Sequence, residues 1–305
     1  ITLIAKDKIC FNTGKACNPD ECPFAKGYYN KIREIIKGTI LSRDIIDTNE
    51  VASIARKHAV CPFELQLDLS LYMDIIVCDY NYFFDPMVYL KRFFDGDASK
   101  MLVLVDEAHN LVERGRAMYS ASFEYFKFKQ VKRSLRHFEH KKLKTAQTRM
   151  TKLFKSFDDL PLGNTLIPML NRTQLNAIDA YLVACNDVNK NHHSVVTDEF
   201  KEFYLELNKF MKLLDFYDDT FALYVTKNDR DFLRISLFCI DPSEHLKRTL
   251  NQVKGKVIFS ATLSPSEYYI DMIGGEKNDP YLSLPSPFDK NNLKLLVAPK
   301  VSIRY

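Results

Sequence analysis

The chain has 305 residues with a net charge of +4, and only nine of the residues are glycine. No Gly-x-Gly-x-x-Gly string occurs, and neither Gly-Lys step is followed by the Ser or Thr that a Walker loop needs, so the sequence excludes a recognisable P-loop and a Rossmann fingerprint. Hydrophobic residues make up 46% and include 22 Phe and 16 Tyr, which excludes a wholly disordered chain, and no apolar run reaches the ~18 residues that a membrane-spanning helix needs.

Four of the seven cysteines fall in a loop-rich N-terminal region: Cys10, Cys17, Cys22 and Cys61. Zinc sites usually use closely spaced cysteine pairs, and this group has only one such pair. Three neighbouring cysteines and a remote one, with proline after two of them, are more typical of four-thiolate binding of an iron–sulfur cluster. Buried thiols without a ligand are the alternative. The odd count and the lack of a secretion signal argue against a disulfide scaffold.

Periodicity predicts helices over 28–36 and 47–58. Four short apolar runs predict strands, at 74–78, 101–105, 256–259 and 293–298. Short, fully apolar strands separated by helices are typical of a buried parallel sheet, so we expect an α/β fold. The remaining cysteines lie in apolar strands or in a helix, which predicts core positions for Cys78, Cys185 and Cys239.

About 150 residues separate the second predicted strand from the third, far too many for a loop. Residues 121–220 place Leu, Phe and Met at spacings of three and four, which predicts long helices with a break at 161–168. Residues 221–239 favour strands and are expected to return the chain to the parallel sheet. We therefore predict a helical domain inserted into the α/β domain.

Positive charge is concentrated within the predicted insert. Residues 127–155 hold eleven Lys or Arg and one acid, Glu139, so this segment carries +10 and the rest of the chain −6. A basic stripe on an acidic body is typical of contact with a polyanion, and a solvated helix face is the alternative. The candidate DNA-binding residues of the stripe are Lys127, Lys129, Lys132, Arg133, Arg136, Lys141, Lys142 and Lys144.

The second predicted strand runs directly into Asp106-Glu-Ala-His109. Ligands of open parallel sheets bind just beyond the carboxyl ends of the strands. There, one carboxylate can hold Mg²⁺ and the next can orient or deprotonate a water. The pair suits nucleotide hydrolysis, and an ordinary acidic helix start is the alternative.

The third predicted strand ends in Ser260-Ala-Thr262-Leu-Ser264. Hydroxyls at this strand tip can form hydrogen bonds with His109 and Glu107, and the alternative is a plain N-cap for the next helix. Together and in this order, the two strand tips resemble motifs II and III of a superfamily 2 helicase.

Further strings extend this resemblance over nearly the whole chain. They are Cys61-Pro-Phe-Glu-Leu, Asp79-Tyr-Asn-Tyr-Phe-Phe-Asp-Pro86, Asp106-Glu-Ala-His-Asn-Leu111, Cys239-Ile-Asp-Pro-Ser243, Ser260-Ala-Thr-Leu-Ser264 and Ser286-Pro-Phe288. In this order the chain resembles the XPD/Rad3-like and DinG-like iron–sulfur superfamily 2 DNA helicases. The string Asp79-Tyr-Asn-Tyr is more similar to bacterial members.

The resemblance implies four segments: a 4Fe–4S cluster domain (1–68), a first part of RecA-like motor domain 1 (69–114), a helical Arch domain (115–235) and a second part of that motor domain (236–305). It implies ATP-dependent 5′-to-3′ translocation on single-stranded DNA and unwinding of forked duplex in repair or recombination, with ATP, Mg²⁺ and the cluster as cofactors. We expect a fragment without the P-loop and second RecA-like domain, inactive alone, from a cytoplasmic protein, or a nuclear one in a eukaryote. The alternative is a non-catalytic module, stabilised by a cluster or zinc, that binds nucleic acid or protein.

Residue by residue, the resemblance assigns Mg²⁺ binding to Asp106 and hydrolysis to Glu107. Coupling between hydrolysis and DNA falls to His109, Ser260 and Thr262. The cluster ligands are the quartet Cys10, Cys17, Cys22 and Cys61. Phe63 matches an aromatic residue that stacks on a base, with core packing as the alternative. Leu67 stands where the family often has Arg, which puts a DNA clamp from this domain in doubt.

Overall fold

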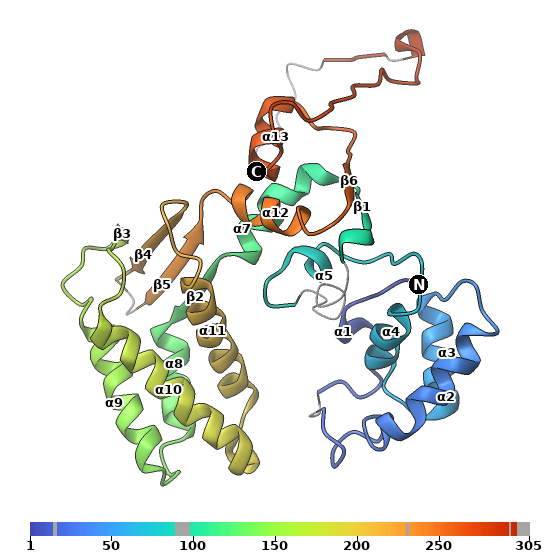
Figure 1. Cartoon of the computed structure of the whole chain (residues 1–305). Helices are drawn as coiled ribbons and strands as arrows, with labels where there is room; N and C mark the ends of the chain where they lie inside the picture. The colour runs from blue at the N-terminus through green and yellow to red at the C-terminus, as the bar shows by residue number, and fades with distance from the viewer. Residues whose placement is uncertain (15–16, 89–97, 230–231, 293, 298–305) are drawn as a thin grey trace.

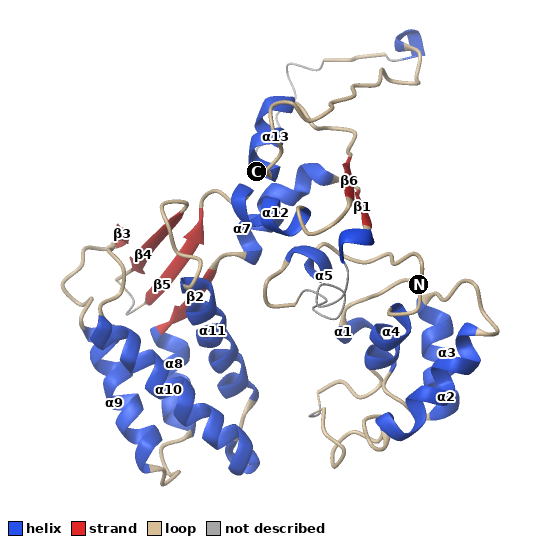
Figure 2. Ribbon diagram, in the orientation of Figure 1, coloured by secondary structure: helices blue, strands red, loops and turns tan. Residues whose placement is uncertain are grey.

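The computed structural model describes residues 1–14, 17–88, 98–229, 232–292 and 294–297, and these form three parts (Figure 1). The first is helical and carries the cysteine quartet. The second is built on two parallel strands, and the third on helices that cover an antiparallel sheet (Figure 2). In the view of Figure 1 the first part lies at the lower right and the third at the lower left, both below the parallel strands. No helix in the described part of the chain is long and apolar enough to cross a membrane.

The N-terminal part contains four helices: α1 (Lys6–Ile9), α2 (Tyr28–Ile40), α3 (Thr48–His58) and α4 (Pro62–Ser70). The two predicted helices are confirmed as α2 and α3. Helix α3 begins where the side chain of Asp47 accepts a 2.8 Å hydrogen bond from the amide of Glu50, a cap that stabilises a helix by about 1 kcal/mol. Val51, Leu65 and their neighbours form a small apolar core of this part, separate from that of the other two.

The second part contains β1 (Leu102–Val105) and β6 (Gly255–Ile258), which pair in parallel with Val105 opposite Ile258. The predicted parallel pairing is therefore confirmed. The prediction that these strands are buried is wrong, because Leu102 and Leu104 are each 72% exposed. Around the pair lie α5 (Asn81–Phe84), α7 (Leu111–Met118), α12 (Ser243–Leu250), α13 (Ser266–Ile273) and the 3₁₀ turns η1 (Ala98–Lys100) and η2 (Ala108–Asn110). The 3₁₀ turn η4 (Lys290–Asn292) lies at the tip of an arm that projects beyond α13 (Figure 1).

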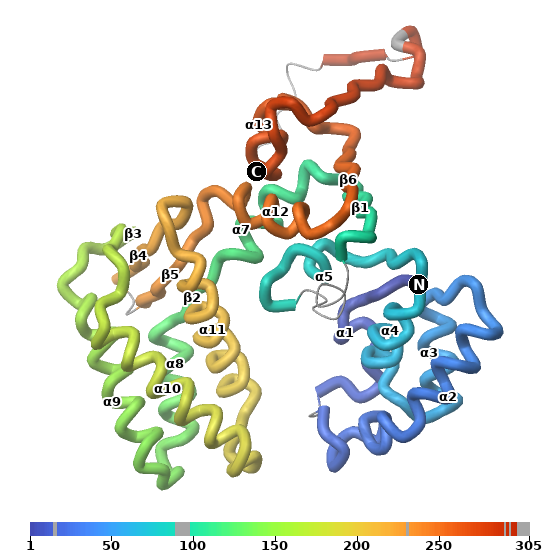
Figure 3. Tube along the Cα trace, in the orientation of Figure 1, coloured from blue at the N-terminus to red at the C-terminus, as the bar shows by residue number. Residues whose placement is uncertain are grey.

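Two predicted strands do not form. Residues 74–78 make one isolated parallel bridge, between Val77 and Thr2, and Val77 is 58% exposed. Residues 294–297 are exposed, and 293 and 298 lie outside the described residues. Figure 3 shows residues 294–297 on the returning half of an arm that projects away from the rest of the molecule. An apolar run becomes a strand only where another strand satisfies its backbone groups, and the described residues provide none beside 294–297.

The third part contains β2 (Ala121–Glu124), α8 (Tyr125–Ser134), α9 (Lys141–Lys155), β3 (Gly163–Leu166), α10 (Arg172–Asn191), the 3₁₀ turn η3 (His193–Val195), α11 (Asp198–Leu214), β4 (Phe221–Lys227) and β5 (Leu233–Cys239). The predicted long helices are confirmed, but β2 and β3 interrupt the segment that was expected to be helical. The strands form an antiparallel sheet in the order β2-β5-β4-β3. The prediction that 221–239 return to the parallel sheet is therefore wrong, and β5 continues past the boundary expected at 235.

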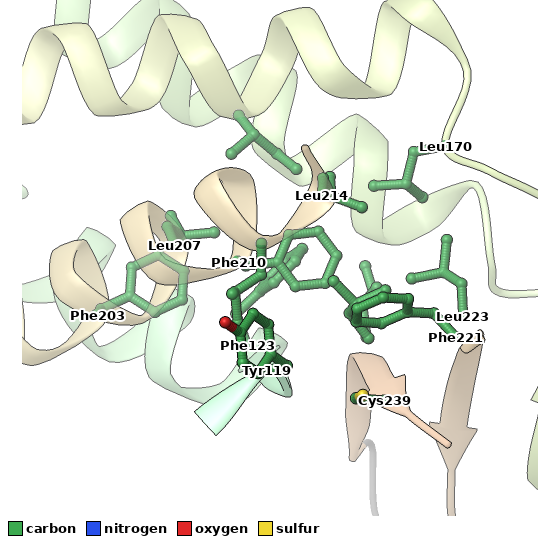
Figure 4. Packing of buried hydrophobic residues seen from close by; sticks show 14 of the residues in the cluster. Tyr119, Phe123, Leu170, Phe203, Leu207, Phe210, Leu214, Phe221, Leu223 and Cys239 are labelled. Atoms are coloured by element: carbon green, nitrogen blue, oxygen red, sulfur yellow. The ribbon is translucent and has the colours of Figure 1, made fainter. Parts of the chain in front are cut away.

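Strand β4 shows why this sheet needs helices on one face only. Phe221, Leu223 and Val225 are buried while the alternating residues are half-buried, a period of two typical of antiparallel sheets. Figure 4 shows Phe221 and Leu223 beside α11, whose Phe210 ring lies 4.8 Å from the ring of Phe123 of β2. Cys185 and Cys239 are buried, as predicted, but Cys78 is exposed, because the strand expected around it does not form.

Candidate functional site

The carboxyl ends of β1 and β6 meet at one edge because the two strands are parallel. Beyond the strands the pairing continues. The amide of Phe259 donates to the oxygen of Val105 at 3.0 Å, and the amide of Ala108 donates to the oxygen of Phe259 at 3.1 Å. These bonds hold the turn after β1 against the turn after β6. The Asp106–His109 string and the Ser260–Ser264 string therefore lie side by side.

Three side chains converge at this edge. The Nδ1 atom of His109 lies 2.7 Å from the hydroxyl of Ser260 and 3.2 Å from Oε2 of Glu107, and the Ser260 hydroxyl lies 3.5 Å from the same carboxylate oxygen. The Glu107 side chain is 60% exposed, so a substrate can reach it. Every member of this group is a hydrogen-bond donor or acceptor, so the group can orient a water. A change of charge at Glu107 or His109 can also alter the hydrogen bond to Ser260 and so affect the turn after β6.

Thr262 joins the group through Ser260. Its amide donates to the Ser260 hydroxyl at 3.2 Å, and the two hydroxyls lie 3.5 Å apart. Helix α13 begins at Ser266 after Pro265, so neither hydroxyl residue caps it. The contact predicted between Ser260 and the Glu107–His109 pair is present, and the N-cap alternative is not.

The backbone turns sharply between the two carboxylates. Glu107 has φ +47° and ψ +40°, a left-handed conformation that costs a non-glycine residue roughly 1 kcal/mol. Its amide donates to Oδ1 of Asp106 at 2.7 Å. The second carboxylate oxygen of Asp106 therefore takes no part in this bond. It can serve as a ligand of Mg²⁺, which prefers oxygen ligands.

Tyr80 supports this turn, and the sequence argument did not select it. Its hydroxyl donates to the backbone oxygens of both Asp106 and Glu107, the latter at 2.9 Å. Burial raises the pKa of Tyr80, and the charges of the two carboxylates raise it further, so the hydroxyl remains a donor. Arg114 of α7 holds the same segment by donating to Asp79 at 2.9 Å. The string Asp79-Tyr-Asn-Tyr was the available signal, but it pointed to a family rather than to a contact.

The four cysteines of the N-terminal part share one electrostatic environment. Lys6 forms a hydrogen bond to Cys17, which raises the pKa of its ammonium group, and Cys10 and Cys61 act in the same direction. Burial raises the pKa of the Cys61 thiol, whereas the amides at the start of α4 lower it, and Cys22 lies close enough to contribute. Four soft sulfur donors beside a cation and helix amides suit an anionic iron–sulfur cluster. Over the described ranges, no three His, Cys, Asp or Glu side chains are gathered around one metal position.

Phe63 lies in the first turn of α4, whose N-cap is Cys61, and packs, half-buried, against the apolar core around Val51 and Leu65 and against the small cluster of Leu3, Leu67 and Tyr82. Leu67, one turn further, is buried. This packing agrees with the alternative of a core role for Phe63, whereas stacking on a base stays a prediction.

The basic stripe lies on α8, α9 and the turn between them. Lys127 is 2.6 Å from Glu202 and 2.5 Å from Glu206 of α11, so this charge is neutralised locally. Lys144 pairs with Glu139. Arg133 and Lys141 are exposed and form no ion pair with any other described residue. The structure therefore separates stripe residues with acidic partners from those open to a polyanion.

Comparison with known proteins agrees with these features. The DEAD_2 family model matches residues 2–127. The human protein "Regulator of telomere elongation helicase 1" is 33% identical over 97 residues, which is 32% of this chain and 8% of that protein. The Candida glabrata "ATP-dependent DNA helicase CHL1" is 28% identical over 118 residues, 37% of this chain and 14% of that protein. The matches thus span a small fraction of these relatives' own length.

Solved structures extend the likeness of fold to nearly the whole chain. A structure named "XPD helicase" aligns with a TM-score of 0.55 at 18% identity, over 92% of this chain and 48% of that one. A second, "Truncated XPD", aligns with a TM-score of 0.54 at 16% identity, over 93% of this chain and 78% of that one. The chain is thus similar to the DEAD_2 family over residues 2–127 and to proteins named as helicases over about a third of its length, and its mixed α/β fold matches part of an XPD structure.

Proposed function

We propose that this chain supplies part of an ATP-dependent DNA helicase. The observation that carries the proposal is the convergence of Glu107, His109 and Ser260 at the carboxyl edge of two parallel strands, within 3.5 Å of one another. Asp106 holds Mg²⁺, and Glu107 orients and deprotonates the attacking water. His109 and Ser260, with Thr262 behind them, transmit the state of the nucleotide to the turn after β6. ATP itself needs a phosphate-binding loop that this sequence does not contain.

The proposed domain roles follow the three parts. The N-terminal part, 1–68, holds a 4Fe–4S cluster through Cys10, Cys17, Cys22 and Cys61. The cluster would cross-link the loops that precede α2 to the start of α4. Residues 69–114 and 236–305 belong to motor domain 1, and 115–235 form the Arch. The stripe on α8 and α9 contacts the phosphate backbone of single-stranded DNA.

Unwinding of a forked duplex tests the function and its direction. An ATPase-active preparation of the protein is offered duplexes with a single-stranded 5′ or 3′ tail, with ATP or a non-hydrolysable analogue. We expect strand separation only with ATP and only on the substrate with the 5′ tail. Binding of both tails without separation of either would instead favour the non-catalytic binding module.

A further inference from the structure

A small pocket of about 200 Å³ lies where the α5 segment, the end of α7 and α12 meet (Figure 1). Its wall is largely aromatic. Phe83 and Phe84 contribute rings 4.8 Å apart, Tyr119 closes one side, and Phe216 comes from the end of α11. Phe84 and Tyr119 are 3% and 5% exposed, so this end of the pocket is closed to solvent.

His245 of α12 lies in the same wall and is 3% exposed. Its ring stacks on Tyr119, with centroids 4.3 Å apart and planes 14° from parallel. Neither ring nitrogen has a hydrogen-bond partner among the described residues. Burial lowers the pKa of His245, so the ring is neutral and offers one donor and one acceptor. A buried polar group left without a partner is costly, and a ligand that bonded to one of the two nitrogens would reduce that cost.

The opposite end of the pocket is polar and open. Arg248 and Gln252 are exposed and lie three and seven residues after His245, so they line the same side of the pocket. Arg248 forms no ion pair with any other described residue, and its positive charge lowers the pKa of three groups at longer range: Tyr119, Asp218 and His245. Thr249, between them, bonds to the backbone oxygen of His245 at 3.3 Å. The pocket thus runs from a cation at its mouth, along aromatic rings, to an unpaired imidazole.

We propose that this pocket binds a single nucleotide unit, with the base among the aromatic rings, its edge on His245 and its phosphate on Arg248. The volume is below the roughly 300–1,000 Å³ of pockets for drug-sized ligands, which suits one heteroaromatic ring with its phosphate outside. Aromatic rings accept any base by stacking, and guanidinium groups suit phosphate oxygens. The unit comes either from a free nucleotide or from a single-stranded DNA. The pocket shares no residue with the Glu107–Ser260 group.

Fluorescence of 2-aminopurine, which falls on stacking, tests this site without any ATP hydrolysis, so failure of the proposed helicase activity leaves the result unaffected. The chain is titrated with 2-aminopurine riboside, with its 5′-monophosphate, and with 2-aminopurine inside oligodeoxythymidine. Saturable quenching by the monophosphate identifies a free nucleotide as the source. Quenching by the oligonucleotide alone identifies single-stranded DNA.

Variants assign the quenching to the pocket. His245→Phe keeps the stacking on Tyr119 but cannot form a hydrogen bond to the base. We expect it to lower the affinity for each ligand that quenches by about tenfold. Arg248→Gln should lower the affinity for the phosphorylated ligands about tenfold and leave the affinity for the riboside unchanged. Arg172→Gln, an exposed arginine at the start of α10, serves as the matched control. Circular dichroism and melting confirm that each variant folds. Absence of saturable quenching by the wild type, or equal affinities in all variants, overturns the proposal.

Discussion

The hydroxyl of Tyr80 donates a 2.9 Å hydrogen bond to the backbone oxygen of Glu107, the residue that turns in the left-handed conformation directly after β1. A side chain far away in sequence thereby fixes the peptide that aims the candidate hydrolytic carboxylate. The parallel strands also help to place Glu107, because the amide of Phe259 donates to the oxygen of Val105 and the amide of Ala108 donates to the oxygen of Phe259.

Replacement of Tyr80 tests that support. In Tyr80→Phe the ring remains and the hydroxyl bonds to Asp106 and Glu107 are lost, although the Glu107 oxygen still accepts from the amide of Asn110, so the free energy of unfolding should fall by about 1 kcal/mol. The rate of ATP hydrolysis should fall by roughly ten- to a hundredfold, because small displacements of a catalytic group are costly. Chemical denaturation and steady-state kinetics measure the two effects. Tyr72→Phe, at an exposed tyrosine, should change neither, and an unchanged rate in Tyr80→Phe would remove the positioning role.

The basic stripe offers a matched pair of lysines. Lys141→Gln removes an exposed charge that has no ion pair in the described structure, so the slope of log affinity for single-stranded DNA against log salt should become shallower by about 0.7. Lys127→Gln removes a charge already held by Glu202 and Glu206, so it should change the slope less. Fluorescence anisotropy over a salt series measures both. Equal slopes in both variants and the wild type would contradict a DNA contact on this face.

The cysteine quartet predicts a coloured protein. Anaerobically purified wild type should absorb in the visible range through the cluster, and Cys17→Ser should lose most of that absorbance together with its iron. Cys78→Ser is the matched control, because Cys78 is exposed and outside the quartet. A colourless wild type with stoichiometric zinc would contradict the cluster and favour the zinc alternative.

His245 predicts a pH dependence of stability. In the folded chain the pKa of His245 lies below the ordinary 6.5, chiefly because the ring is buried and also because of the positive charge of Arg248. The acids Asp218, Glu244 and Asp241 oppose this shift. Just below pH 6.5, His245 therefore binds a proton more readily in the unfolded chain than in the folded chain. As pH falls below 6.5, the free energy of unfolding should decrease by up to about 1.4 kcal/mol per pH unit, and above 6.5 the residue should contribute no slope.

Urea denaturation between pH 5 and 8 measures this dependence. His245→Phe should remove the part of the slope that lies below 6.5. The same slope in variant and wild type would assign it to other groups.

Part of this architecture could be predicted from the residues alone. Apolar runs that end in Asp106 and Ser260 predicted two parallel strands, and parallel strands bring their carboxyl ends together, so the Glu107–Ser260 contact followed. The short strands β2 and β3 could not be predicted, because four residues between helices carry too little periodicity. Residues 75–78 are apolar like β1, but in the described structure their backbone partner is the short segment 1–3, which gives one parallel bridge rather than a strand. Tyr80 was missed because a long-range contact to a backbone oxygen has no sequence pattern.

Glu107→Gln gives the most direct test of the account. The amide keeps the size of the side chain but cannot take a proton from water, and a general base contributes roughly 10²–10⁴-fold to a rate. In an ATPase-active preparation, hydrolysis stimulated by single-stranded DNA should fall by at least about a hundredfold, with DNA affinity unchanged. Glu113→Gln, at an exposed glutamate of α7, should retain the wild-type rate. Undiminished hydrolysis in Glu107→Gln would contradict the assignment of this strand edge as the hydrolytic site.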